Sequence, residues 1–438
     1  MLYLKFSQTL NNIFSTFFSR IVAAIFALIS GILIARVLGP EIKGYLSIIT
    51  LVGSTCVVVG SLGINYFNTY LVAKDKDKIT NLFTNSLWFS LIMSLICIIL
   101  IFILYNLYSL IFHNIPIKHL FIYLFSLPFF FFFNISTPIL AGEQKFKSYN
   151  FFTIFYPFLN LFFISLFLIF HLYDLKYLVA ACFLTNIISG TLALILIKPK
   201  IFTLFRFDAK LFRKALNYGL KIYLVGIFAL LIVKVDLYMV NLFRGATEAG
   251  FYSLVSSFSD MFFLLPYSVA FIILPQAIRQ EGDKKIYFIS RYFCFTFYLS
   301  LALSMGFILF IKPVVQLLYG TLFLPSAEII LIILPGLIFW SLVTILSQYF
   351  AATSYNFKII IGWLFVFLLN IILNFIYIPQ LGMKGAALSS VISYFLIFIY
   401  IFILFKKETN ISLKQIFQFS YSDIKQLLRP GHNLNKKF

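Results

Sequence analysis

Charged residues are scarce in this chain, and acidic residues are scarcer than basic ones. Asp and Glu together number 14 among 438 residues, and charged residues make up only 11%. The four cysteines, Cys56, Cys97, Cys182 and Cys294, each lie alone inside an apolar stretch, so the sequence predicts no disulfide framework. The four histidines form no metal-ligand motif. We therefore expect neither a metal site nor another cofactor.

Hydrophobic residues are abundant instead. They make up 62% of the chain, which includes 58 phenylalanines and has a mean hydropathy of +1.01. Apolar stretches of 18 or more residues recur, and each is long enough to cross about 30 Å of hydrocarbon as a helix. The sequence therefore predicts an all-α membrane protein with twelve transmembrane helices, at residues 12–37, 44–66, 82–107, 118–141, 150–171, 177–197, 218–243, 250–276, 287–311, 326–351, 358–378 and 383–405.

The net charge of +20 is distributed as membrane topology requires. Basic residues lie in short loops and form no continuous patch, so we expect no nucleic-acid partner. With the N-terminus inside, 23 Lys and Arg residues fall in cytoplasmic loops and 7 in the opposite loops. Because basic loops stay inside during insertion, both termini should face the cytoplasm, in a cell inner membrane. The first apolar stretch is too long for a signal-peptide core and should remain as a helix.

A hydrophilic segment at residues 198–217 divides the chain into two halves of six helices. Residues 39–47, which contain Gly39 and Gly44, match residues 245–253 at an offset of 206, and 141–147 match 352–358 at an offset of 211. Six spans per half give both halves one orientation, so the expected pseudo-two-fold axis runs along the membrane normal. The expected division is a six-helix bundle at 1–200, a basic connector at 201–217, a second bundle at 218–405 and a basic tail at 406–438.

Four short motifs occur in an order typical of one transporter family. They are residues 35–40 with Gly44 and Tyr45, residues 140–142 with Phe146 and Lys147, residues 236–245 with Gly250 and Tyr252, and Gly382 with residues 385–387. In this order they resemble the polysaccharide exporters, the O-antigen flippases of the multidrug/oligosaccharidyl-lipid/polysaccharide (MOP) superfamily. The resemblance covers residues 10–405. Peptidoglycan-precursor flippases of the superfamily usually carry two more C-terminal helices, where this sequence has a polar tail.

The resemblance implies a function and its partners. It implies a flippase in which two six-helix bundles alternate access and carry an undecaprenyl-diphosphate-linked oligosaccharide, an O-antigen or capsule repeat unit, to the outer leaflet. The expected partners are this lipid-linked substrate, membrane lipids, a coupling ion such as H⁺ or Na⁺, and polysaccharide assembly proteins.

Ionisable residues inside the spans are the candidate site, because each costs several kcal/mol in lipid without a partner or a cavity. Lys234 and Asp260 lie about 15 Å from the outer side on adjacent helices, which predicts an ion pair. Asp236, two positions from Lys234, points to nearly the opposite side of its helix. Asp236 and Asp260 are therefore candidates for ion coupling or cavity lining, or alternatively for holding helices together.

Three further bases gather near the cytoplasmic ends of their spans, where a diphosphate would enter. They are Arg20, Lys221 and Arg291. A guanidinium offers a fork that matches phosphate oxygens, whereas an ammonium is a point charge. Lys221 and Arg291 also fit ordinary snorkelling to the interface, while Arg20 lies too deep for it. We expect Arg20 to contact the substrate.

Two other functions compete with the flippase. A multidrug or cation antiporter of the same superfamily would share the fold, but the six intramembrane charges comprise four bases and two acids, which suits an anionic substrate better. A membrane glycosyltransferase or polymerase would need a soluble domain or a large outer loop, and the sequence predicts neither. Asp75-Lys76-Asp77 looks like a sugar-nucleotide motif but lies in a short charged loop. We expect no enzyme activity.

Overall fold

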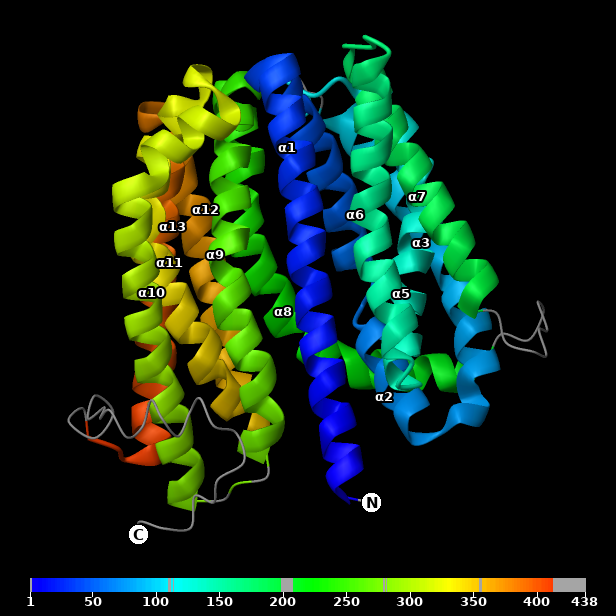
Figure 1. Ribbon diagram of the computed structural model, residues 1–438, viewed down its shortest axis with the longest axis vertical. Helices are drawn as coiled ribbons and strands as arrows, with labels where there is room; N and C mark the ends of the chain where they lie inside the picture. The colour runs from blue at the N-terminus through cyan, green and yellow to red at the C-terminus, as the bar shows by residue number, and fades with distance from the viewer. Residues whose placement is uncertain are drawn as a thin grey trace. The chain divides into compact units, whose positions relative to one another are not determined.

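In a computed structural model, the chain folds into α-helices joined by short connections (Figure 1). The structure describes residues 2–108, 112, 114–197, 208–278, 280, 282–353 and 357–412. For residues 2–14, 73, 76, 216–222, 271–272, 274–276 and 278 it describes the backbone alone. Within these ranges there is no β-strand.

Most of the helices are long and apolar enough to cross a membrane. Nine described helices meet that condition, or ten if α4 (Ile117–Leu124) and α5 (Leu127–Gly142), which are bent by 46° at their junction, form one span. This count takes α1 (Leu2–Gly60) as one element, although Gly39 breaks it, and it leaves out the 33-residue α9 (Ala246–Ile278). The chain is a multi-pass all-α membrane protein, and the number twelve stays a prediction.

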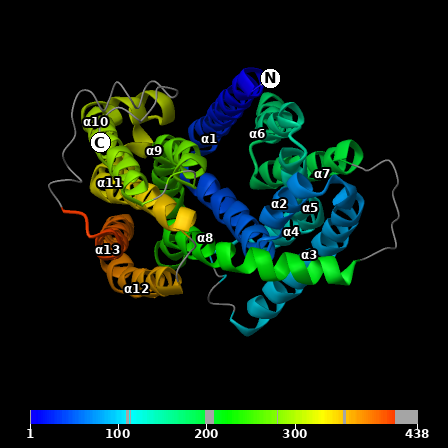
Figure 2. The ribbon, with the colours of Figure 1, turned by 90° about the horizontal axis from the view of Figure 1, so that it is seen from below.

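The first compact unit comprises Met1–Leu254 and Leu318–Phe323. Its helix α5 packs against α2, α3 and α7, and α1 packs along α6 (Figures 1 and 2). The unit also holds the start of α9 and the short helix η3. The bounds not yet given are α2 (Ile64–Lys74), η1 (Lys76–Lys78), α3 (Ile79–Leu107), α6 (Phe146–Ile169), α7 (Leu175–Ile197), α8 (Ala209–Arg244) and η3 (Thr321–Phe323).

Polar side chains join the helices of this unit in places that lipid cannot reach. Asn68, 1% exposed, donates to the Ser86 hydroxyl and to the Ile135 carbonyl, both at 3.0 Å. Asn186 donates to Ser126 at 2.8 Å and accepts from Tyr156 at 2.9 Å. Because apolar burial drives helix association only weakly inside a bilayer, such hydrogen bonds and close packing hold the helices together.

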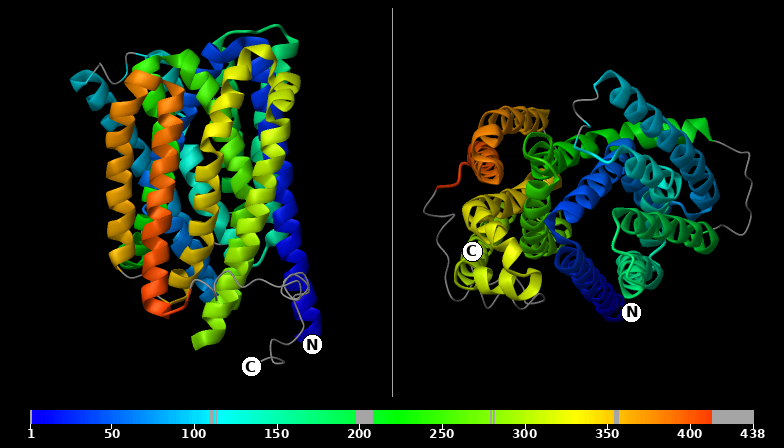
Figure 3. Two further views of the ribbon diagram at one scale, coloured as in Figure 1. Left: turned by 90° about the vertical axis from the view of Figure 1, so that its left-hand side faces the viewer. Right: turned by 90° about the horizontal axis from the view of Figure 1, so that it is seen from above.

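The second compact unit comprises Val255–Leu317 and Leu324–Phe438. It holds the rest of α9, most of α10 (Gly282–Tyr319), and α11 (Leu324–Thr353), α12 (Phe357–Leu381) and α13 (Met383–Thr409). Helix α13 packs against both α11 and α12, and Figure 3 shows α12 and α13 side by side. Asn370 donates to the Ser393 hydroxyl at 3.1 Å across the α12–α13 interface.

Most helices lie close to the predicted spans, although α1 begins at Leu2 rather than 12 and α10 runs to Tyr319 rather than 311. Three further differences concern α8, α2 and the pair α4 and α5. Helix α8 begins at Ala209 rather than 218, because the Asp208 carboxylate accepts a hydrogen bond from the Leu211 N–H at 2.9 Å and caps the helix. Helix α2 was not predicted, and the span expected at 44–66 ends at Gly60. The span expected at 118–141 is the bent pair α4 and α5.

The predicted division of the chain stays a prediction. Residues 201–207 of the expected connector and 413–438 of the expected tail lie outside the described residues. Helix α8 belongs to the first compact unit, together with the helices before it. Tyr223 donates a hydrogen bond to the Val58 carbonyl at 2.8 Å, and Asn114 donates one to the Asn241 carbonyl at 2.8 Å. Packing of this kind does not identify which helices share a repeat.

The charged loop after α2 forms a local turn. Asp75 ends α2, and its carboxylate accepts a hydrogen bond from the Asp77 N–H at 3.0 Å. Such a hydrogen bond is typical of Asx turns. The acidic pair thus has a local structural role in this loop.

Candidate functional site

Two glycines break the helices of the first unit in the same way. Gly39 in α1 has φ 78° and ψ −178°, and Gly245 between α8 and α9 has φ 84° and ψ 179°. This conformation is open mainly to glycine. Pro40 follows Gly39 as the first residue of the next helical segment, where its missing N–H removes no helix hydrogen bond. The two glycines are 206 residues apart, so both copies of the predicted repeat share one backbone conformation.

A reciprocal contact joins the two segments that follow these breaks. A Cβ added to Gly44 would overlap the carbonyl oxygen of Ala246, and one added to Gly250 would overlap the carbonyl oxygen of Pro40. Pro40 and Ala246 differ by 206 residues, as do Gly44 and Gly250. The glycine of each segment therefore contacts the same position of the other segment, as in a two-fold contact.

Lys43, beside this crossing, is held between aromatic rings. Its side chain is only 6% exposed, and its Nζ lies 4.8 Å from the centroid of the Tyr319 ring and 5.2 Å from that of Phe323. Tyr319 and Phe323 are themselves buried, and Phe323 also meets Phe251 edge to face at 5.4 Å. A cation over aromatic faces is stabilised by their quadrupoles. The predicted spans at 12–37 and 44–66 leave Lys43 in a loop, whereas the structure buries it within α1.

Asp236 is the most deeply buried of the predicted site residues whose side chains the structure describes. Its side chain is 1% exposed, and its carboxylate accepts a hydrogen bond from the Tyr252 hydroxyl at 3.2 Å. This bond links α8 to the start of α9 across the break at Gly245. Lys234, two residues earlier, is half-buried, in keeping with side chains that point to different sides of α8. The hydrogen bond is compatible with the helix-holding alternative, and the role of Asp236 stays a prediction.

The basic candidates divide between the two units. Arg20 lies in α1 with an exposed side chain, inside the segment Ser15–Gly60 that is apolar enough to span. Lys221 lies in α8, and its side chain is outside the described part of the chain. Arg291, in the second unit, is half-buried, with its guanidinium carbon 4.3 Å from the centroid of the Tyr287 ring. Their grouping around a diphosphate stays a prediction.

Asp260 lies in the second unit with an exposed side chain, while Lys234 belongs to the first unit. The predicted ion pair between them stays a prediction. Tyr267 of α9 and Trp340 of α11 were not singled out from the sequence. Tyr267 is 44% exposed, and its hydroxyl accepts a hydrogen bond from Trp340 Nε1 at 3.2 Å. Their sequence signal was hidden by the abundance of aromatic residues.

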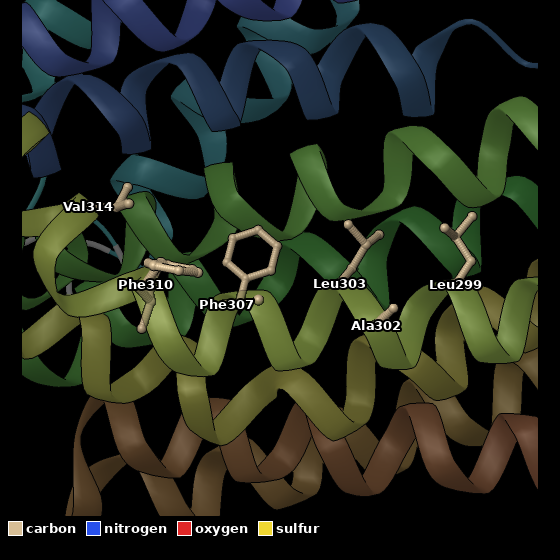
Figure 4. Close-up of a pocket in the computed structure, with 8 residues that line it drawn as sticks. Leu299, Ala302, Leu303, Phe307, Phe310 and Val314 are labelled. Carbon is tan, nitrogen blue, oxygen red and sulfur yellow. The ribbon is translucent and has the colours of Figure 1, made fainter.

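A hollow of about 380 Å³ follows one face of α10 (Figure 4). Its lining is apolar throughout and includes Leu299, Leu303, Phe307 and Phe310. Such a lining suits a hydrocarbon chain and offers no group that could hold a sugar or a phosphate. Among the described residues, no group of three or more His, Cys, Asp or Glu side chains could hold a metal ion.

The sequence matches a family model described as "Polysaccharide biosynthesis protein" over residues 9–273, more than half of the chain. The chain belongs to this family. The match includes both glycine breaks, Lys43, Asp236 and Asp260. No curated protein matches the sequence.

Solved structures similar to this family member belong to the MOP superfamily. One is "Lipid II flippase MurJ, inward closed conformation", with a TM-score of 0.73 and 20% identity, covering 96% of this chain and 92% of that chain. Another is an inward-facing multidrug resistance MATE family transporter, with a TM-score of 0.73 and 16% identity, covering 89% and 94%. A third is a MOP superfamily transporter from Pyrococcus furiosus, with a TM-score of 0.62 and 17% identity, covering 91% and 95%.

These likenesses establish the fold. This protein has the fold of MOP transporters and flippases rather than that of an enzyme. Both a flippase and a multidrug transporter share it, so the fold alone does not select the substrate.

Proposed function

We propose that the protein is a flippase that carries an undecaprenyl-diphosphate-linked oligosaccharide from the inner to the outer leaflet by alternating access. The observation that carries the proposal is the family match over residues 9–273. The MOP fold supports it, because its members include a flippase for lipid-linked material. An O-antigen or capsule repeat unit is the expected cargo.

Arg20 is the residue we assign to the diphosphate. It lies 19 residues before the break at Gly39, roughly 28 Å along the helix, and its side chain is exposed. Its planar fork can bind two phosphate oxygens at once. Lys221 and Arg291 are the weaker candidates for the same group.

The setting follows from the same proposal. The protein would lie in the cytoplasmic membrane with both termini inside, as the distribution of basic loops favours. Asp236 or Asp260 would couple transport to H⁺ or Na⁺ influx, with Lys234 as a partner of one acid. Proteins of polysaccharide assembly would receive the cargo.

Reconstitution in liposomes tests the proposal directly. The sidedness of a fluorescent undecaprenyl-diphosphate oligosaccharide would be followed with and without an imposed ion gradient, next to liposomes that lack the protein. Protein-dependent flipping is the expected result. Absence of flipping by folded, reconstituted protein would contradict the proposal.

A multidrug or cation antiporter is the second candidate, and the likeness to a MATE family transporter favours it. Gradient-driven efflux of cationic dyes from the same liposomes, without flipping of the lipid-linked sugar, would establish that function instead. The excess of bases among the intramembrane charges supports the anionic substrate.

A further inference from the structure

One face of α9 in the second unit carries several polar side chains, together with Met261, which is 39% exposed, and half-exposed Leu264. Ser257, Asp260 and Tyr267 are exposed on it, and Ser268 is half-exposed. The neighbouring positions Phe262 and Phe263 are buried in the unit. Asp260 and Tyr267 lie roughly 21 and 31 Å along α9 from Ala246, in the middle of the helix. A carboxylate at that depth is costly in hydrocarbon, so this face should point toward protein or water rather than toward lipid.

Tyr267 on this face is held firmly from behind. Trp340 of α11, 3% exposed, donates its Nε1 hydrogen to the Tyr267 hydroxyl at 3.2 Å. The Phe263 ring lies 5.8 Å from the Tyr267 ring and 5.9 Å from the Trp340 ring, centroid to centroid. Trp340 is packed in turn against Tyr394 and Trp363 at 4.8 and 5.5 Å. Such support fixes the orientation of an exposed ring before any ligand binds.

The Tyr267 hydroxyl keeps its own hydrogen for a ligand. It accepts from Trp340, and in the part of the chain that the structure describes it donates to no residue. Asp260 lies seven residues earlier, two helical turns away on the same face, close enough to interact electrostatically with Tyr267. The face thus presents an aromatic surface, a hydroxyl donor and a carboxylate acceptor together.

We propose that this face binds a sugar ring of the cargo, a proposal that rests on the proposed flippase function. The Tyr267 ring would pack on the apolar C–H face of the sugar, its hydroxyl would donate to a sugar oxygen, and Asp260 would accept hydrogen bonds from sugar hydroxyls. A sugar needs this combination, because its ring carries an apolar face and a rim of hydroxyls. The apolar hollow along α10 offers no such groups (Figure 4).

Binding to purified protein in detergent tests the proposal. The probes are undecaprenyl diphosphates that carry a neutral hexose, an N-acetylhexosamine or a uronic acid, and undecaprenyl diphosphate without sugar. Tyr267→Ala should weaken binding of the preferred glycosylated lipid about tenfold, since it removes one hydrogen bond and one ring contact. Binding of the bare lipid should be unchanged. Tyr267→Phe keeps the ring, so it should weaken binding of the glycosylated lipid by a smaller factor.

The matched control is Tyr298→Ala on α10, because Tyr298 is 49% exposed in the same unit. It should leave both affinities unchanged. If the wild type prefers a glycosylated lipid and Tyr267→Ala keeps the full preference, the sugar site is refuted while the flippase function stands. If the wild type binds no glycosylated lipid more tightly than the bare lipid, the sugar site is refuted and the flippase function loses its support as well.

Discussion

The reciprocal contact of Gly44 and Gly250 makes a quantitative prediction. Gly44→Ala places a methyl group where the Ala246 carbonyl oxygen lies, and Gly250→Ala places one on the Pro40 carbonyl oxygen. Neither obstacle is a side chain that could rotate away, so the two helical segments must separate. Overpacking of this kind costs about 1–3 kcal/mol. It outweighs the roughly 0.5–1 kcal/mol that alanine gains over glycine inside a helix.

A matched control isolates the contact. Gly31 lies in the same helix α1, and a Cβ added there meets no atom within 4 Å. Gly31→Ala should therefore raise the unfolding free energy by up to about 1 kcal/mol. The helix-propensity gain is common to both variants and cancels in their difference. The unfolding free energy of the Gly44→Ala variant should thus be about 1–3 kcal/mol lower than that of the Gly31→Ala variant.

The assay is denaturant titration of the purified protein in mixed micelles, with the double variant included. Because either methyl group pushes the same two segments apart, Gly44→Ala and Gly250→Ala together should cost less than the sum of the single changes. Equal stability of Gly44→Ala and Gly31→Ala would refute the contact. Strictly additive costs would refute its two-fold reciprocity.

Three other substitutions test the charged residues. Arg20→Ala should abolish flipping in liposomes while the protein remains inserted, and normal flipping at normal expression would remove Arg20 from the site. Asp260→Asn should impair transport and be partly rescued by Lys234→Gln if the two residues pair; a double variant no better than the single one would argue against the pair. Tyr252→Phe should lower the unfolding free energy by about 1–3 kcal/mol, because buried Asp236 loses a donor, and an unchanged titration midpoint would contradict that role.

The span positions could be predicted because the bilayer imposes a strong and local rule. Every backbone polar group must be satisfied inside the segment, so long apolar runs become helices at nearly their predicted bounds. The sequence match at an offset of 206 was visible for a similar reason, since Gly39 and Gly245 both need a conformation that only glycine adopts readily.

The aromatic clamp on Lys43 could not be predicted from local patterns. Its rings come from Tyr319 and Phe323, far away in the sequence, and the chain offers 58 phenylalanines and 26 tyrosines as alternatives. The hydrogen bond between Tyr267 and Trp340 was hidden in the same way. Helix α2 was missed because its 11 residues are too few to span and its composition is mixed.

The contacts of the first unit join the helical segments that follow the breaks at Gly39 and Gly245. The second segment of α1, the start of α9 and the segment Leu318–Phe323 all belong to that unit, although α9 and α10 continue into the second. Backbone against backbone at the glycines and a buried cation between aromatic rings leave little freedom there. Any movement of α9 or α10 must therefore either preserve these contacts or break them as a group.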